Sequence, residues 1–198
     1  MGSKYRLVPY LADVFDSVGG ETAVDGFSGS GVVSYLMKRM GYSVTSNDFL
    51  NFPTAIATAT TVNSSQRLTR AEIATICGPA ADDRDFIRST FDGMYFTPED
   101  RAFLDSAWSH IDLLPGHKRA VAISALVLSA ARRQPRGVFT FTDVDRYNDG
   151  RKDMKMSLKD HFLQHAVAYN KTVFSNGKRH RAITGDVFDI PTGADLVY

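Results

Sequence analysis

The stretch VDGFSGSGVVSYLMKRMGYSVTSND, residues 24–48, limits the possible folds of this chain more than any other stretch. A short apolar segment leads into a Gly/Ser turn, and apolar residues then recur at helical spacing from Val32 to Met37. Gly41 fits the position that ends a helix, and YSVTSND follows as a second strand. A strand, a loop, a helix and a strand in this order predict two parallel strands, and therefore an α/β fold.

The Gly/Ser turn is suited to binding an anionic group. Glycines at a strand-to-helix turn allow a ligand to approach the backbone, and the helix N-terminus adds free N–H groups and a partial positive charge. Asp48 ends the second strand 17 residues after Gly31. In nucleotide-binding α/β folds an acid at about this distance accepts hydrogen bonds from ribose hydroxyls. The expected ligand therefore carries an anionic end and a ribose.

The glycine spacing disfavours two common nucleotide sites. It does not match the G-x-G-x-x-G of dinucleotide-binding enzymes, and it lacks the Lys-Ser/Thr pair of a P-loop. S-adenosylmethionine remains, because it has a methionine carboxylate and an adenosine ribose. An oxidoreductase that uses a dinucleotide stays an alternative, which nicotinamide binding would support.

Helical signals fill the middle of the chain. Thr69 and Glu72 form a capping-box pattern, and Thr97 with Pro98 begins a further helix. Residues 117–134 are apolar nearly all round, which is typical of a buried helix. One apolar stripe predicts core packing without a functional role, and it consists of Phe103, Leu104, Trp108 and Ile111.

Charge is spread unevenly along the chain. Residues 132–181 contain 12 basic and 5 acidic side chains, a net charge of +7, whereas the whole chain carries +1. A basic segment in a near-neutral chain favours contact with a polyanion, and a solvated Lys/Arg face is the alternative. The candidate nucleic-acid contacts are Arg132, Arg133, Arg136, Arg146, Tyr147, Asn148, Arg151, Lys152, Lys178, Arg179, His180 and Arg181.

Four segments occur in the order of the motifs of a known family. GSKYRLVPYL, DGFSGSGVVSYL, SND and ITGDVFDIPTGADLVY resemble the successive motifs of Dam-like adenine-specific DNA methyltransferases, and the resemblance covers essentially the whole chain. It implies a Rossmann-like α/β fold that uses S-adenosylmethionine. It also implies DNA adenine methylation within a restriction–modification setting, with double-stranded DNA as the partner.

The resemblance also implies a domain plan and a set of site residues. The plan is a cofactor-binding β/α unit at 1–52, a mainly helical insertion with a target-recognition region at 53–181, and a return to the sheet at 182–198. Asp186 would lie near the cofactor's adenine, with a turn or N-cap role as the alternative. The implied cofactor-binding residues are Lys4, Tyr5, Asp25, Phe27, Ser28, Gly29, Ser30, Gly31, Asp48 and Asp186.

The family's catalytic motif, Asp-Pro-Pro-Tyr, is not present in this sequence. The motif normally follows a strand such as ADLVY, with which this chain ends at Tyr198, and none of the seven prolines is adjacent to another. We therefore expect a partial methyltransferase fold with no catalytic residue of its own, inactive alone, whose partner is a C-terminal polypeptide that carries the motif. A non-catalytic DNA-binding or regulatory fragment is the alternative.

Other features exclude several classes of protein. His161 and His165 lie one helical turn apart, but further ligands are lacking nearby, so we expect no metal site. Cys77 is the only cysteine, which favours a reducing compartment and a cytoplasmic protein. The longest apolar run, residues 120–131, is too short to span a bilayer.

Overall fold

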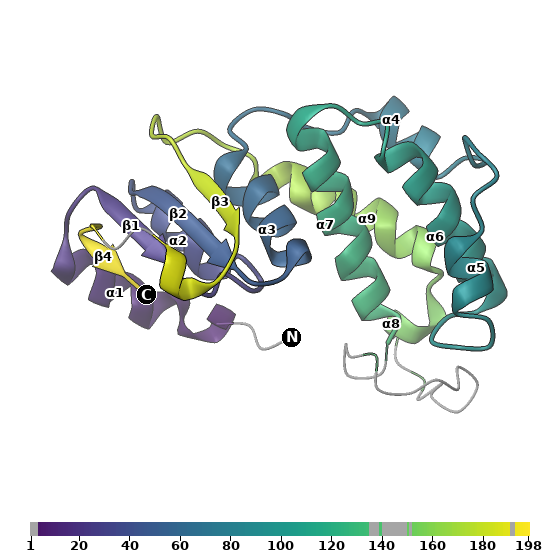
Figure 1. Ribbon diagram of the computed structural model, residues 1–198, viewed down its shortest axis with the longest axis horizontal. Helices are drawn as coiled ribbons and strands as arrows, with labels where there is room; N and C mark the ends of the chain where they lie inside the picture. Colours follow the sequence, from purple (N-terminus) through teal and green to yellow (C-terminus); the bar gives the residue numbers. More distant parts are fainter. Residues whose placement is uncertain (1–3, 135–138, 140–149, 151, 191–192) are drawn as a thin grey trace. The chain divides into compact units, whose positions relative to one another are not determined.

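The computed structural model describes residues 4–134, 139, 150, 152–190 and 193–198, and the chain divides into two compact units (Figure 1). Unit 1 comprises Met1–Gln66 and Thr172–Tyr198, and unit 2 comprises Arg67–Lys171. The sequence plan placed the limits of the insertion at residues 53 and 181. In the structure the segment up to residue 66 belongs with the sheet.

Unit 1 contains a parallel sheet with the strand order β3-β2-β1-β4. This arrangement confirms the α/β class predicted from the sequence. Because all four described strands run in one direction, their carboxyl ends form one edge of the sheet and their amino ends form the other. The strands are β1 (Thr22–Asp25), β2 (Ser43–Asp48), β3 (Arg181–Thr184) and β4 (Leu196–Val197).

Helices cover this sheet and complete the core of unit 1 (Figure 1). Phe15, Met37 and Val44 are almost fully buried in one cluster that joins the first two helices to the strands. The Tyr42 hydroxyl donates to the Phe15 carbonyl at 2.8 Å and so ties the start of β2 to the first helix. The helical segments are η1 (Lys4–Leu7), α1 (Val8–Val18), α2 (Val32–Arg39), α3 (Asn51–Ala57) and the π-helical η2 (Thr58–Val62).

A buried lysine joins α2 to η2. The Lys38 side chain has no exposed surface, and its Nζ donates to the carbonyls of Thr60 at 3.2 Å and Asn63 at 2.9 Å. The same ammonium lies 4.5 Å from the ring centroid of Phe174. Burial lowers the pKa of Lys38 to about 8, because the surroundings disfavour the charged form.

Unit 2 is helical in its described part. The Thr69 capping box and the Thr97 N-cap with Pro98 are both confirmed, since each threonine oxygen accepts the backbone N–H three residues on. The predicted short strand near residues 137–141 falls almost wholly outside the described residues. The helices are α4 (Arg70–Ile76), α5 (Phe86–Thr90), α6 (Pro98–Ile111), α7 (Gly116–Arg132), α8 (Lys152–Lys155) and α9 (Leu158–Thr172).

None of the helices described is long and apolar enough to cross a membrane.

The buried Lys38 predicts a specific pH dependence of stability. The folded-state pKa of about 8 lies below the model value of 10.5, so between these pH values the unfolded chain binds more protons. The free energy of unfolding of the wild type, minus that of Lys38→Met, should therefore increase from pH 8 to pH 10.5, by about 1–3 kcal/mol. Urea unfolding at several pH values measures this difference. Parallel pH profiles for the two proteins would contradict it.

Candidate cofactor site

The loop between β1 and α2 uses glycine where other residues would be strained. Gly29 has φ +47° and Gly31 has φ +73°, both in the left-handed region. Gly31 is the N-cap of α2, and a Cβ at this position would lie 2.9 Å from Cγ2 of Ile56 on α3. The loop therefore needs Gly31 both for its backbone conformation and for its close packing against α3.

Asp48 joins the end of β2 to this loop. Its Oδ2 accepts the Gly29 N–H at 2.9 Å, and its Oδ1 accepts the Leu50 N–H at 3.1 Å. The backbone N–H of Ser28 donates to the Asn47 carbonyl at 2.8 Å. The glycine loop and the acid that the sequence placed 17 residues apart are therefore in direct contact.

The Asn47 side chain links two loops at the carboxyl edge. Its Nδ2 donates to the carbonyls of Gly26 and Gly185, each at 3.2 Å. Gly185 also donates its N–H to the Asp48 carbonyl at 3.0 Å. Next to it, Asp186 accepts the Phe188 N–H at 3.1 Å as an N-cap, which is the alternative role considered for this residue. Asp186 is nevertheless exposed and lies at the same edge as Asp48.

Asp25 is buried below the loop and belongs to a short chain of hydrogen bonds. The Ser34 hydroxyl donates to Asp25 Oδ2 at 2.5 Å, and the Ser46 hydroxyl donates to Ser34 at 2.9 Å. Burial, and to a smaller extent the charge of Asp48, raises the pKa of Asp25. Three buried oxygens around the loop have no partner within the protein, and they are Asp25 Oδ1, Ser28 Oγ and Asn47 Oδ1.

Three aromatic rings are exposed in segments that follow the strand ends. Phe27 follows β1, Phe49 follows β2 and Phe188 follows β3, and their relative exposures are 72%, 76% and 92%. Large aromatic side chains are usually buried, so this exposure at one edge is unusual. Flat apolar surfaces of this kind are suited to contact with the faces of a planar heterocycle.

Lys4 and Tyr5, the other cofactor candidates, lie in η1 just before α1. Both side chains are exposed, with Tyr5 at 74%.

A family model for D12 class N6 adenine-specific DNA methyltransferases matches residues 1–112, more than half of the chain. The chain belongs to this family. It is also similar to the Type II methyltransferase M2.HphI of Haemophilus parahaemolyticus, with 27% identity over 213 residues. That alignment covers 100% of this chain but 63% of the relative, so the chain spans less than two thirds of that protein. No solved structure matches the chain at a significant level.

As in the family's motif order, the loop at residues 26–31 and Asp48 lie at one edge of the sheet, together with Asp186. The candidate DNA contacts of this D12-class chain are arranged differently. Arg133 of unit 2 is held internally by Asp100, whose Oδ2 lies 2.7 Å from the guanidinium, and both side chains are largely buried. Arg132 pairs with Asp153 at 3.3 Å and stays exposed. We therefore correct the sequence assignment for Arg133, because its guanidinium is already bound inside unit 2.

Six further DNA candidates cannot be placed. Arg136, Arg146, Tyr147, Asn148 and Arg151 lie outside the described residues, as does the side chain of Lys152.

The last four candidates lie just before or at the start of β3, at the amino edge of the sheet. Lys178, Arg179 and Arg181 are exposed. His180 is different, because its Nδ1 accepts the Val44 N–H at 3.2 Å and its Nε2 lies 2.9 Å from Asn176 Oδ1. Burial, together with the charge of Lys38, lowers the pKa of His180 to about 4. At neutral pH it is thus an uncharged structural residue, which corrects its assignment as a basic contact.

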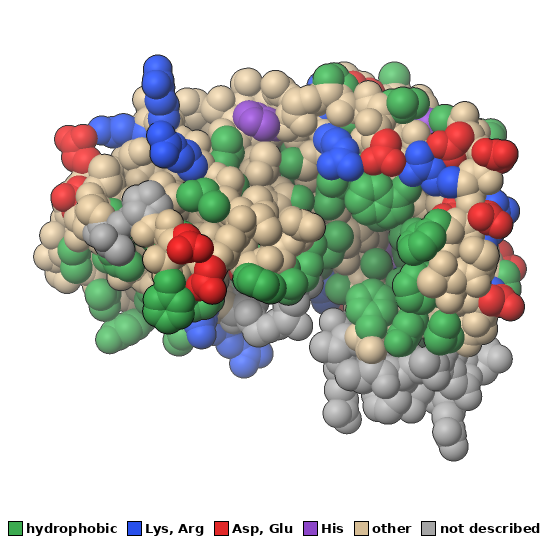
Figure 2. Space-filling model, viewed as in Figure 1, with side chains coloured by type: hydrophobic (Ala, Val, Ile, Leu, Met, Phe, Trp, Pro, Cys, Tyr) green, Lys and Arg blue, Asp and Glu red, His purple; other side chains and the backbone are tan. Residues whose placement is uncertain are grey.

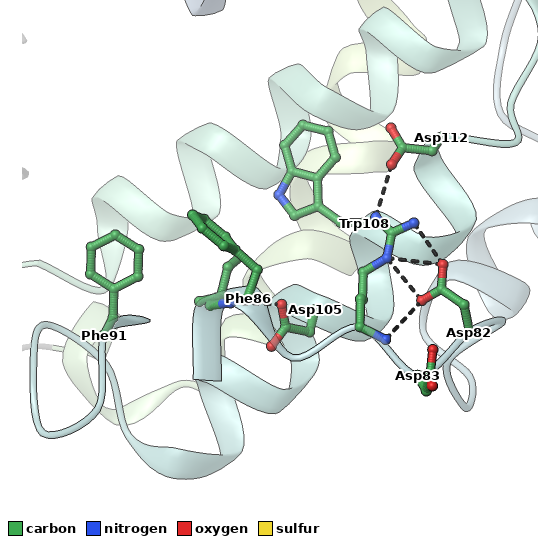
Figure 3. A pocket seen from close by; sticks show the side chains of 9 residues that line it. Asp82, Asp83, Phe86, Phe91, Asp105, Trp108 and Asp112 are labelled. Atoms are coloured by element: carbon green, nitrogen blue, oxygen red, sulfur yellow. Dashed lines mark hydrogen bonds and ion pairs between the residues drawn. The ribbon is translucent and has the colours of Figure 1, made fainter. Parts of the chain in front are cut away.

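Unit 2 has a cavity of its own, of about 750 Å³, shown in Figure 3. Phe86, Phe91 and Trp108 form apolar walls, so Trp108 lines an open cavity instead of packing in the core as the sequence suggested. At the rim, Arg84 pairs with Asp82 at 2.7 Å and with Asp112 at 2.8 Å, which holds the pKa of both carboxyls below their usual range. The guanidinium of Arg84 is therefore already satisfied by carboxylates of this unit.

The two histidines of α9 have structural partners. The rings of His161 and His165 are stacked with centroids 5.8 Å apart, His161 contacts the Asp153 carbonyl and His165 contacts the Ser129 hydroxyl. Burial is the main cause that lowers the pKa of His165 to about 4. No group of side chains suited to a metal ion occurs among the described residues.

Sequence reasoning missed Asn47, Ser34 and Ser46. Each is a common polar residue whose importance depends on a partner far along the chain, and no local pattern distinguishes it. The only available signal was position, since Asn47 stands directly before the ribose acid Asp48.

The two left-handed glycines predict different costs of substitution. Gly31→Ala should lower the free energy of unfolding by about 2–4 kcal/mol, because the left-handed backbone and the contact with Ile56 both oppose a Cβ. Gly29→Ala is the matched control, because its nearest neighbour would be 3.8 Å away, and it should cost about 1–2 kcal/mol. Urea unfolding compares the two variants. Equal losses would show that packing against α3 is unimportant.

Proposed function

We propose that the protein takes part in the methylation of adenine N6 in double-stranded DNA, with S-adenosylmethionine as the methyl donor. Family membership supports the reaction class. The observation that carries the proposal is the hydrogen bond between Gly29 and Asp48, because it brings an anion-binding loop and a ribose-binding acid together. We place the activity in the cytoplasm and in a restriction–modification setting, in line with the buried single cysteine and the Type II relative.

The residues of the loop fit this cofactor. Three buried oxygens without partners surround the loop, and buried polar groups normally have partners, so they favour a ligand with several donors. The cofactor has such donors in its amino group and its ribose hydroxyls. The N–H groups at the start of α2 would hold its carboxylate, and Asp48 would accept from the ribose.

The exposed rings and Asp186 fit the other end of the cofactor. Phe49 and Phe188 offer apolar faces for the adenine, and Asp186 provides an acceptor for its amino group. Asn47 would keep both parts of the site at a fixed separation, because it donates to the loop on each side. Lys4 and Tyr5 stay proposed members of the site from the resemblance alone.

The bound cofactor supplies an electrophilic methyl group on a sulfonium. The described residues at the carboxyl edge would orient that group, and Asp25, buried and bonded to Ser34, would keep the floor of the loop rigid. Holding the acceptor is a separate task, because the adenine amino group must be extruded from the duplex and aligned with the methyl carbon. The insertion and its basic residues are the proposed target-recognition region.

The glycine spacing disfavours the dinucleotide oxidoreductase, and the exposed acid Asp186 at the same edge gives it no support. A non-catalytic DNA-binding or regulatory role differs from our proposal in one property, the transfer of a methyl group.

Cofactor binding tests the role of Asp48. Asp48→Ala removes the acceptor for the ribose hydroxyls and for the Gly29 N–H, so the affinity for S-adenosylmethionine should fall by about 1–3 kcal/mol. Isothermal titration calorimetry measures the change, with Asp189→Ala as a control acid that is also exposed near this edge. Equal affinity of the wild type and Asp48→Ala would refute the assignment.

Methyl transfer tests the reaction. The sequence contains no Asp-Pro-Pro-Tyr, so we expect no labelled methyl group in DNA after incubation of this chain alone with labelled cofactor. A polypeptide that carries this motif should restore transfer to adenine when it is added. Transfer by the chain alone would show that catalytic residues lie within it, and binding of cofactor and DNA without transfer in either case would favour the regulatory alternative.

A further inference from the structure

A basic cavity lies at the edge of the sheet opposite the proposed cofactor site. The loop at residues 175–181, here called the amino-edge loop, leads into β3 and lines a cavity of about 730 Å³. Four of the lining side chains are the hydroxyl groups of Ser43, Thr45, Ser64 and Ser175. The cationic side chains of the lining are Lys178, Arg179 and Arg181.

The amino-edge loop is held firmly by hydrogen bonds within unit 1. Asn176 donates from Nδ2 to the carbonyls of Lys38 at 2.9 Å and Tyr42 at 3.0 Å, and Ser43 donates to the Arg179 carbonyl at 2.5 Å. His180 is anchored through both ring nitrogens, to Val44 and Asn176. The loop therefore presents its cations from a fixed backbone, which reduces the ordering cost of binding.

The charges of this loop are available to a ligand. Among the described residues, no carboxylate pairs with Arg179 or Arg181, and both side chains are exposed. Lys178 pairs with Glu21 at 2.8 Å, but both partners are exposed, and such pairs contribute little. Figure 2 shows Lys and Arg side chains gathered over the end of unit 1 where this loop precedes β3. Guanidinium groups and hydroxyls on one surface match the oxygens of phosphate groups.

The length of β2 separates this loop from the cofactor edge. Ser43 begins β2 and lies in the cavity, whereas Asp48 ends β2 at the glycine loop. Six residues at about 3.3 Å each place the two ends about 16 Å apart. Along a duplex, with about 3.4 Å per base pair, this distance corresponds to about 5 base pairs.

We infer that the amino-edge loop binds backbone phosphates of duplex DNA about 5 or more base pairs away from the methylated adenine. This inference rests on the proposed function. Contacts to phosphates carry no sequence information, so the loop adds affinity and orientation while other residues choose the target. A free phosphate or nucleotide would present the same oxygens, and the experiment separates these two sources.

The test compares duplexes of about 10 and about 30 base pairs cut from one sequence. In fluorescence anisotropy, Arg179→Gln/Arg181→Gln should weaken binding of the longer duplex about 10-fold and that of the shorter duplex less than about 2-fold. The slope of log affinity against log salt for the longer duplex should fall by about 2, one for each lost phosphate contact. Calorimetry with S-adenosylmethionine should give the wild-type affinity and so confirm that the variant is folded.

Two controls have opposite expected signs. Glu21→Gln frees Lys178 from its carboxylate and should strengthen binding of the longer duplex, whereas Arg179→Lys/Arg181→Lys keeps the charge and most of the affinity. An unchanged affinity of the Gln double variant for the longer duplex, or equal losses for both lengths, would overturn the inference. So would inorganic phosphate that shifts the NMR signals of the loop while duplex affinity is the same in wild type and variant. If the wild type binds neither cofactor nor any duplex, the proposed function fails as well.

Discussion

Parallel pairing of β1 with β2 is the constraint on which the proposed cofactor site depends. The register pairs Asp25 with Ser46, so the two strands end within a few residues of each other at the same edge. The next hydrogen bond, from Ser28 to Asn47, extends this pairing into the glycine loop. Only then does Gly29 reach Asp48. A shift of the register would separate the loop from its acid and would also move the side chains to the other face of the sheet.

Unit 1 buries an unusual number of polar groups for a small sheet, and most of them are satisfied internally. Lys38 donates to two carbonyls, and Ser34 links Asp25 to Ser46. The unsatisfied oxygens are concentrated instead around the glycine loop. Since unpaired buried oxygens are costly, their concentration at one place indicates where a ligand completes the structure.

Local patterns in the sequence were enough to predict the glycine loop, the helix end at Gly41 and the caps at Thr69 and Thr97, because each depends on residues a few positions apart. Long-range partners were not predictable in this way. Arg133 binds Asp100, which is 33 residues away, and His180 binds Val44, which is 136 residues away. A count of charges treats all basic residues alike, whereas the structure separates those that are bound internally from exposed ones such as Arg179.

The two edges of the sheet have opposite electrostatic character, and this separation has a consequence for DNA. Asp48 and Asp186 give the carboxyl edge a negative charge, which suits a ribose and an adenine but repels phosphate. Cations at that edge would neutralise these acids, so the backbone of the duplex is better held elsewhere. The amino edge is about 16 Å away, which exceeds the Debye length of about 8 Å at physiological ionic strength. The cations of the amino-edge loop can therefore attract phosphates without weakening the acids that bind the cofactor.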